Sequence, residues 1–142
     1  MIIKILAAYV TTMCFAIYIN VSKKEIVFSG LTGCIGWLVY IISSTYLDEI
    51  IYSNFFAAIA ISTTAHILAK IRKNPVTIYQ IAGMFPIVPG AGMYKTLYYI
   101  VNEDYSLSMK YLFETLQIAG GIAAAIVLVA TFNNLLQKKQ LA

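Results

Sequence analysis

Charged residues are scarce in this chain. Only 11% of its 142 residues are Asp, Glu, Lys or Arg, whereas 61% are hydrophobic. A soluble domain carries about 25% charged residues, so a soluble domain with less than half of that share would have too little polar surface to meet water. The composition therefore predicts a single transmembrane domain that comprises residues 1–142.

Residues that serve catalysis or metal binding are scarce as well. The chain has one histidine, no histidine-glutamate zinc motif and no arginine cluster that could bind phosphate. The two cysteines, Cys14 and Cys34, both fall within apolar segments, where a thiol is ordinarily a small buried hydrophobe. We therefore expect no enzymatic activity, no cofactor, no metal site and no disulfide.

The basic residues do not gather into a surface for nucleic acid. The formal net charge is +4, but the lysines and the arginine stand singly or in short clusters between apolar stretches. Such clusters are typical of topology signals in membrane proteins. We expect the lipid bilayer to surround the chain, and we expect no nucleic-acid partner.

Five apolar stretches approach the roughly 20 residues that a helix needs to cross a bilayer. They are Ile2 to Ile19, Ile26 to Ile42, Ile51 to Ala69, Val76 to Val101, and Tyr111 to Leu135. The sequence therefore predicts an all-α integral membrane protein with about five transmembrane helices. The first stretch is expected to be a retained anchor, because its apolar run is long and no small-x-small cleavage triplet precedes Lys23.

The loops between these stretches alternate in charge. Five crossings would collect most basic residues on one side: Lys23, Lys24, Lys70, Arg72, Lys73, Lys138 and Lys139. The other side would carry Asp48, Glu49, Glu103 and Asp104, with Lys4, Lys95 and Lys110 on or toward it. The positive-inside rule then predicts an outside N-terminus and an inside C-terminus. An even number of crossings would place the first two basic loops and the C-terminal lysines on opposite sides of the membrane.

Small residues and aromatic residues indicate how the helices pack and where they end. Gly30, Gly33 and Gly36 recur in the second stretch, and Gly120 and Gly121 lie in the fifth. Small residues allow helix backbones to approach closely, so we expect both clusters to serve packing. Several aromatic residues near segment ends are typical of an interfacial belt: Trp37, Tyr40, Tyr46, Tyr98, Tyr99 and Tyr105.

The fourth stretch is interrupted by Pro86, Pro89, Gly90 and Gly92. Proline removes a backbone donor and blocks the preceding helical turn, whereas glycine permits positive dihedrals or a close approach. Irregular backbone at membrane depth persists only if it is buried in protein or lines a wet cavity, and such interruptions mark transporter binding sites. A half-helix that begins near Ala91 would direct its positive end at a solute carboxylate. A structural kink is the alternative.

Three ionisable residues within the apolar stretches are candidates for function. Lys95 directly follows the interruption and either holds an anionic group or extends to the surface. Glu114 lies at a similar depth and either pairs with Lys95 or faces interfacial water. His66 either relays protons, since histidine titrates near neutrality, or lies at the interface. We name Glu114 and His66 as candidates for ion or proton coupling.

Two segments carry a resemblance to a known family. Residues 72–77, Arg-Lys-Asn-Pro-Val-Thr, and residues 85–95, Phe-Pro-Ile-Val-Pro-Gly-Ala-Gly-Met-Tyr-Lys, resemble the signature of the bacterial threonine/serine exporter family. The resemblance extends from Gly30 onward and is strongest to the small stand-alone subunit that corresponds to the C-terminal half of the full-length exporter. It implies ion-driven export of hydroxy amino acids or small dicarboxylates such as succinate across the cytoplasmic membrane.

The interruption and the residues next to it are the predicted site, and the resemblance adds a partner. The predicted substrate-binding or gating residues are Pro86, Pro89, Gly90, Gly92, Tyr94 and Lys95. The partner that the resemblance implies is a larger membrane subunit similar to the exporter's N-terminal half, with self-association when that subunit is absent. One broken helix is also few for a transporter core, because many such folds pair two corresponding broken helices. A non-transporting accessory subunit is the alternative function.

Overall fold

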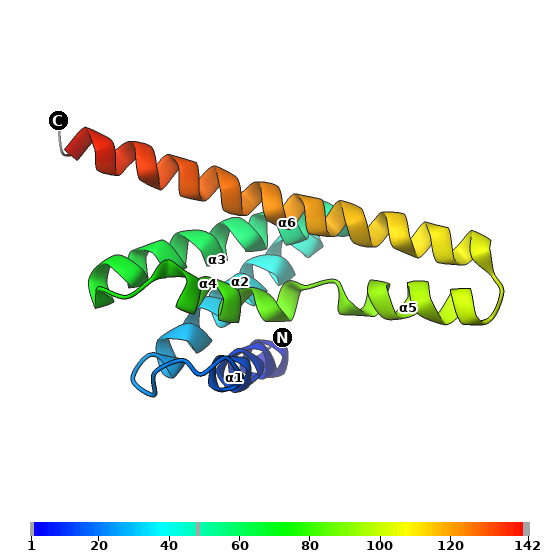
Figure 1. Cartoon of the computed structure of the whole chain (residues 1–142), viewed down its shortest axis with the longest axis horizontal. Helices are drawn as coiled ribbons and strands as arrows, with labels where there is room; N and C mark the ends of the chain where they lie inside the picture. The colour runs from blue at the N-terminus through cyan, green and yellow to red at the C-terminus, as the bar shows by residue number, and fades with distance from the viewer. Residues whose placement is uncertain (1, 48, 141–142) are drawn as a thin grey trace.

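The computed structural model describes residues 2–47 and 49–140, and within them it is helical without strands (Figure 1). Asp48 and the side chains of Lys138 and Lys139 lie outside the described part. The elements are α1 (Ile2–Tyr18), α2 (Ile26–Tyr46), α3 (Ile50–Arg72), α4 (Val76–Met84), the short 3-10 helix η1 (Phe85–Ile87), α5 (Gly90–Val101) and α6 (Tyr105–Gln140). The prediction of an all-α membrane protein is confirmed.

Within the described residues, three helices are long and apolar enough to cross a bilayer: α2, α3 and α6. The segments Val76–Ile87 and Gly90–Val101 form a pair bent by 52°, which makes a fourth span if the pair crosses together. α1 has 17 residues and is therefore about 25 Å long, somewhat shorter than the ~30 Å hydrocarbon core. Figure 1 looks nearly along α1, whereas α3 and α6 run lengthwise across it. A crossing by α1 stays a prediction.

Small residues bring the helices close together, as the sequence predicts. A Cβ atom on Gly33 would overlap Thr12 of α1, and one on Gly36 would overlap Ile61 of α3. Ile61 is fully buried, with Ala57 and Ala58 on the same helix. Gly120 of α6 differs, because no neighbouring helix of the described chain comes within 4 Å of the position that its Cβ would take. The glycines of α2 therefore serve packing within the chain, whereas Gly120 makes no such contact among the described residues.

One end of the bundle gathers the basic segments. Glu25, directly before α2, pairs with Arg72 at the end of α3, so the α1–α2 loop and the α3–α4 turn lie together. Asn133 of α6 lines a cavity with Lys70 and Asn74 at the same end. We call this end, formed by residues 23–25, 70–74 and 133–136, the basic end. Its composition agrees with the predicted gathering of basic loops on one side.

At the opposite end, α5 and the first half of α6 form a hairpin that extends beyond the other helices (Figure 1). Gly121 faces Ile51 at the start of α3, so residues 105–120 extend about 24 Å past that point. Among the described elements α5 packs against α6 alone. The rings of Tyr99 and Tyr111 stack at 5.4 Å, and the hydroxyl of Ser108 donates to the Thr96 carbonyl at 3.0 Å. We call residues 90–120 the hairpin.

Candidate functional site

The interruption between α4 and α5 follows from two prolines. Pro86 lies in η1, and Pro89 directly precedes α5. Neither residue has a backbone N–H, so neither can continue a helical hydrogen-bond ladder. Val88 between them is extended, with φ −61° and ψ 133°. The helix therefore stops at Met84 and begins again at Gly90, which produces the 52° bend.

The two glycines of the interruption differ in what they do. No glycine in the described residues has a positive φ, so the left-handed freedom that the sequence offers at Gly90 and Gly92 is not used. Gly92 instead permits close packing, because a Cβ there would overlap the hydroxyl oxygen of Thr115. α5 begins at Gly90, next to the expected Ala91. The Gly90 N–H donates to the Val88 carbonyl at 2.8 Å and the Met93 N–H to the Pro89 carbonyl at 3.2 Å, which leaves the N–H groups of Ala91 and Gly92 without an intrahelical acceptor.

A cavity of about 340 Å³ lies between the interruption and α6. We call it the α6-side cavity. It brings together six of the eight predicted site residues: Pro86, Pro89, Gly90, Gly92, Lys95 and Glu114. Its other walls include Trp37, Tyr40, Asn54, Tyr111 and Thr115. The predicted residues around the break thus share one cavity with side chains from α2, α3 and α6.

The cavity holds one positive and one negative side chain that do not pair directly. The Lys95 ammonium lies 4.9 Å from the centroid of the Tyr111 ring, a cation–π contact. Glu114 lines the same cavity, but the one ion pair within the described residues joins Glu25 and Arg72. The direct Lys95–Glu114 pair that the sequence left open is therefore not formed. Both charges remain available to a ligand.

Two neutral side chains add hydrogen-bond acceptors to this cavity. Asn54 donates its amide to the Ile50 carbonyl at 2.8 Å, which leaves its side-chain oxygen as an acceptor. The hydroxyl of Thr115 donates to the Tyr111 carbonyl at 2.7 Å and retains acceptor capacity. Neither residue was predicted from the sequence. Asn54 could have been identified as a candidate from the sequence, because an amide in an apolar membrane segment usually has a hydrogen-bond partner.

Tyr94 and His66 lie away from this cavity. Tyr94 is 67% exposed and its ring is 6.1 Å from that of Tyr98 on the outer surface of α5. His66 lines a separate cavity at the basic end, with Lys70 among its other walls. The Nδ1 atom of His66 is 2.8 Å from the Ser62 carbonyl oxygen, so Nδ1 carries the hydrogen.

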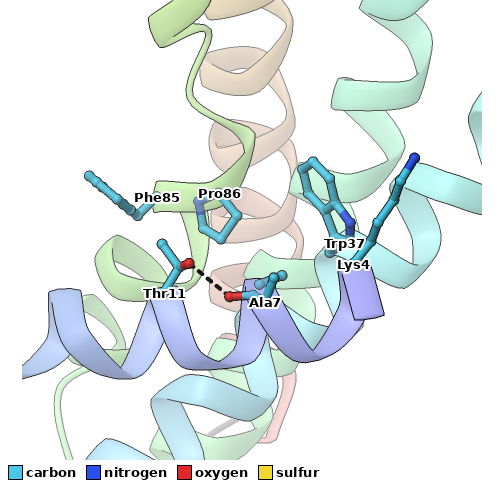
Figure 2. Close-up of a pocket in the computed structure, with 7 residues that line it drawn as sticks. Lys4, Ala7, Thr11, Trp37, Phe85 and Pro86 are labelled. Atoms are coloured by element: carbon cyan, nitrogen blue, oxygen red, sulfur yellow. Dashed lines mark hydrogen bonds between the residues drawn. The ribbon is translucent and has the colours of Figure 1, made fainter. Parts of the chain in front are cut away.

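Trp37 lies at the interruption rather than at an interface (Figure 2). It is near the middle of α2 and its ring stacks on that of Tyr40 at 5.0 Å. Its indole Nε1 is buried and has no hydrogen-bond partner among the described residues. The expected role of Trp37 in an aromatic belt is therefore wrong, because tertiary packing turns its side chain toward Pro86.

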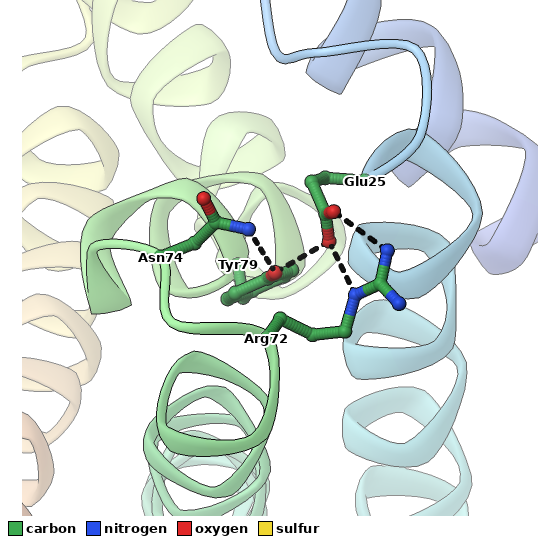
Figure 3. Close-up of polar contacts among 4 residues, drawn as sticks. All are labelled: Glu25, Arg72, Asn74 and Tyr79. Atoms are coloured by element: carbon green, nitrogen blue, oxygen red, sulfur yellow. Dashed lines mark hydrogen bonds and ion pairs between the residues drawn. The ribbon is translucent and has the colours of Figure 1, made fainter.

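A cluster of hydrogen-bonded polar side chains connects the helices at the basic end (Figure 3). Arg72 donates two hydrogen bonds to the Glu25 carboxylate, at 2.8 and 3.1 Å. The Tyr79 hydroxyl donates to the same carboxylate at 2.6 Å, and Asn74 donates to the Tyr79 hydroxyl at 3.3 Å. Glu25 is only 6% exposed. The hydrogen bonds from Arg72 and Tyr79 lower its pKa, because they stabilise the carboxylate.

This cluster joins the α1–α2 loop, the end of α3 and the start of α4. It fixes the beginning of α4, and hence the helix that leads into the interruption. From the sequence, Glu25 and Arg72 were recognisable only as loop charges. Their separation of 47 residues hides the pair from any local pattern.

Comparison with known proteins gives two matches. A family model described as "Threonine/Serine exporter, ThrE" matches residues 4–132. A curated protein of Corynebacterium glutamicum, "Threonine/serine exporter", is 29% identical over 125 residues. That match takes in 88% of this chain but 25% of the relative, so the chain spans a quarter of the relative's length. No solved structure matches the chain.

Proposed function

The chain belongs to the threonine/serine exporter family, and we propose that it is a subunit of a secondary transporter that exports threonine and serine across the bacterial cytoplasmic membrane. The observation that carries this proposal is the α6-side cavity. There, a broken helix, a lysine and a glutamate meet in one space of about 340 Å³. Charged side chains within the apolar segments of a membrane protein are rare and usually mark the path of a substrate or an ion.

The chemistry of the cavity suits a zwitterion. Lys95 and the N–H groups of Ala91 and Gly92 in the first turn of α5 are partners for a carboxylate. Glu114 is a partner for an ammonium group. Asn54 and Thr115 offer acceptors to a hydroxyl group. Threonine and serine carry all three groups.

Succinate, the alternative substrate class, fits this cavity less well. Its second carboxylate would approach Glu114, and two carboxylates that share a site repel each other. We therefore propose hydroxy amino acids, rather than dicarboxylates, as the substrates.

The two candidate residues for coupling to an ion gradient lie in different places. Glu114 lines the α6-side cavity, whereas His66 lies at the basic end. We propose that Glu114 has the coupling role and that His66 is the secondary candidate.

We further propose that the basic end faces the cytoplasm and that the N-terminus of the chain lies on the outer side, in agreement with the positive-inside rule.

The hairpin is the part of the structure that supports a partner subunit. α3 is about 34 Å long, which is enough to span the hydrocarbon core. The hairpin extends beyond the end of α3 at which that helix begins. The exposed side chains of Met93, Leu97 and Val101 on α5 are apolar. A larger membrane subunit, or a second copy of the chain in its absence, would cover them.

A purely accessory role is the second candidate, and the isolation of α5 favours it. Among the described elements this helix packs against α6 alone, which suits assembly whether or not a solute binds beside it. Substitution of Pro89 separates the two roles. Pro89→Ala restores a backbone donor at the interruption, whereas Pro75→Ala, the matched control, removes a proline outside it.

The test is efflux of radiolabelled threonine and serine from cells that express the chain with the proposed larger membrane subunit. We expect Pro89→Ala to abolish most efflux, while membrane insertion and co-purification of the partner stay normal. Pro75→Ala is expected to retain efflux. Normal efflux in Pro89→Ala combined with loss of the partner would contradict the transport role and support the accessory one.

A further inference from the structure

The ring of Tyr111 on α6 is in contact with the Lys95 ammonium group. The ammonium nitrogen lies over the ring, 4.9 Å from its centroid, and both residues line the α6-side cavity. The negative face of an aromatic ring attracts a cation within about 6 Å of the ring centroid. The ring therefore gives the ammonium group a defined place at the cavity wall.

A second tyrosine holds the Tyr111 ring from the side of α5. The rings of Tyr99 and Tyr111 stack with their centroids 5.4 Å apart, and their planes differ by 6°. Both residues are half-buried. Lys95 and Tyr99 are four residues apart on α5 and so lie on the same face of that helix. Tyr111 meets this face and contacts both side chains, and the stack restricts the tilt of the ring that Lys95 contacts.

Two further contacts fix the relative position of α5 and α6 on either side of the lysine and the ring. Toward the interruption, Gly92 packs directly against Thr115. Toward the turn of the hairpin, the hydroxyl of Ser108 donates to the Thr96 carbonyl at 3.0 Å, and both of these residues are buried. The lysine lies between the two contacts on α5, and the ring lies between them on α6. The packing of the hairpin therefore maintains the cation–π contact.

The ammonium group of a flexible lysine at this position has other places to go. The Lys95 side chain is exposed and could extend to the membrane surface, or it could pair with Glu114, which lines the same cavity. An ion pair would neutralise both charges, and a solute would have to break it. A tyrosine ring carries no net charge, so the ammonium group on it keeps its full charge, and its N–H donors are not taken up by a carboxylate. The contact with Tyr111 thus keeps Lys95 at the cavity without neutralising it.

We propose that Tyr111 is a positioning residue of the solute site, which holds Lys95 at the α6-side cavity, apart from Glu114, in readiness for the carboxylate of the solute. Because the lysine side chain is already ordered, binding of the solute costs less conformational entropy. This inference rests on the proposed function, since it assumes that Lys95 binds the solute carboxylate. It adds a residue, and a requirement for an aromatic ring, that the proposed function does not contain.

Fluorination of the ring tests this role with little change of shape. The full chain is reconstituted in proteoliposomes with the proposed larger membrane subunit, and initial rates of L-threonine efflux give an apparent KM and a maximal rate. Phenylalanine and its mono-, di- and trifluorinated forms are introduced at position 111, because each fluorine weakens the negative potential of the ring face. We expect the apparent KM to rise with each added fluorine, while the maximal rate changes little. A ring that serves packing alone would give no such trend.

Three ordinary variants accompany the fluorinated series. Tyr111→Phe keeps the ring and is expected to keep the apparent KM of the wild type. Tyr111→Leu removes the ring and is expected to raise the apparent KM about two- to fivefold, which corresponds to one cation–π contact at an exposed site. Tyr105→Leu, the matched control, removes an exposed tyrosine of α6 that does not line the cavity and is expected to export as the wild type does. An equal rise in Tyr111→Phe and Tyr111→Leu would contradict the role of the ring face.

The Lys95→Gln background shows whether the ring acts through the lysine. Without the ammonium group, the fluorinated series is expected to give a constant apparent KM. A KM that still rises with fluorination in this background would show that the ring contacts the solute itself, which would contradict a positioning role.

Two outcomes separate this inference from the proposed function. If Lys95→Gln lowers efflux while fluorination at position 111 has no effect in the presence of Lys95, the positioning role is wrong and the proposed function stands. If Lys95→Gln exports threonine with the KM and maximal rate of the wild type, the proposed function itself fails.

Discussion

Gly92 lies directly against Thr115, so close that a Cβ atom at position 92 would overlap the Thr115 hydroxyl oxygen. This contact holds the first turn of α5 on α6 and shapes one wall of the α6-side cavity. We predict that Gly92→Ala pushes the two helices apart and lowers the free energy of unfolding by about 1 to 3 kcal/mol. Thermal unfolding of the detergent-solubilised protein, followed by circular dichroism, measures the loss.

Gly90→Ala is the matched control, because a Cβ atom at position 90 would meet no neighbouring helix of the described chain within 4 Å. It is expected to unfold as the wild type does. Thr115→Ala removes the overlapping hydroxyl, so the double variant with Gly92→Ala is expected to recover much of the lost stability. Equal destabilisation by the Gly90 and Gly92 variants would refute the contact.

Glu114 should determine which solutes the cavity prefers. Its carboxylate attracts an ammonium group and repels a second carboxylate. Glu114→Gln is therefore expected to reduce serine and threonine efflux about tenfold while succinate efflux is maintained or increased. The ratio of the two efflux rates, measured in the same cells, reports this change. An unaltered ratio would show that Glu114 does not face the solute.

The pair of Glu25 and Arg72 predicts how stability depends on pH. Because hydrogen bonds from Arg72 and Tyr79 lower the pKa of Glu25 in the folded protein, the carboxylate stabilises the fold fully above the usual glutamate pKa of about 4.3. That contribution is lost as the pH falls through the lowered folded-state pKa. We expect the melting temperature of the wild type to stay level from neutral pH to about pH 5 and to fall below that range.

Glu25→Gln tests the origin of this fall. The variant is expected to melt several degrees below the wild type at neutral pH, and the difference should shrink in acid as the wild type loses its own carboxylate. Glu49→Gln replaces an exposed glutamate outside the ion pair and should follow the wild type throughout. A constant difference between Glu25→Gln and the wild type at every pH would contradict the account.

Local chemistry made the interruption and the helix packing predictable. Two prolines without backbone donors must end α4 wherever the chain folds, and Gly33 or Gly36 at helical spacing must bring α2 close to its neighbours. Both features depend on a few adjacent residues. Lys95 and Glu114 were likewise identifiable, because charges are rare in apolar segments.

Contacts between distant segments could not be predicted in the same way. In the sequence alone, Trp37 resembles an interfacial residue. Only the tertiary structure shows that α1 and Pro86 lie next to it. The Glu25–Arg72 pair and the contribution of Thr115 to the cavity depend on which helices are neighbours. Tyr94 shows the reverse case, since its position within the motif suggested a site residue and the rotation of α5 turns it outward. Helix rotation and neighbour choice are tertiary properties that one sequence does not reveal.

The most direct test of the account is threonine efflux from cells in which Lys95→Gln replaces the wild-type chain, with Lys110→Gln as the charge-matched control. Both proteins must insert into the membrane and co-purify with the proposed partner subunit in equal amounts. We predict that Lys95→Gln lowers the efflux rate about tenfold or more, and that Lys110→Gln exports threonine as the wild type does. Equal efflux from all three proteins would contradict a solute site at the interruption.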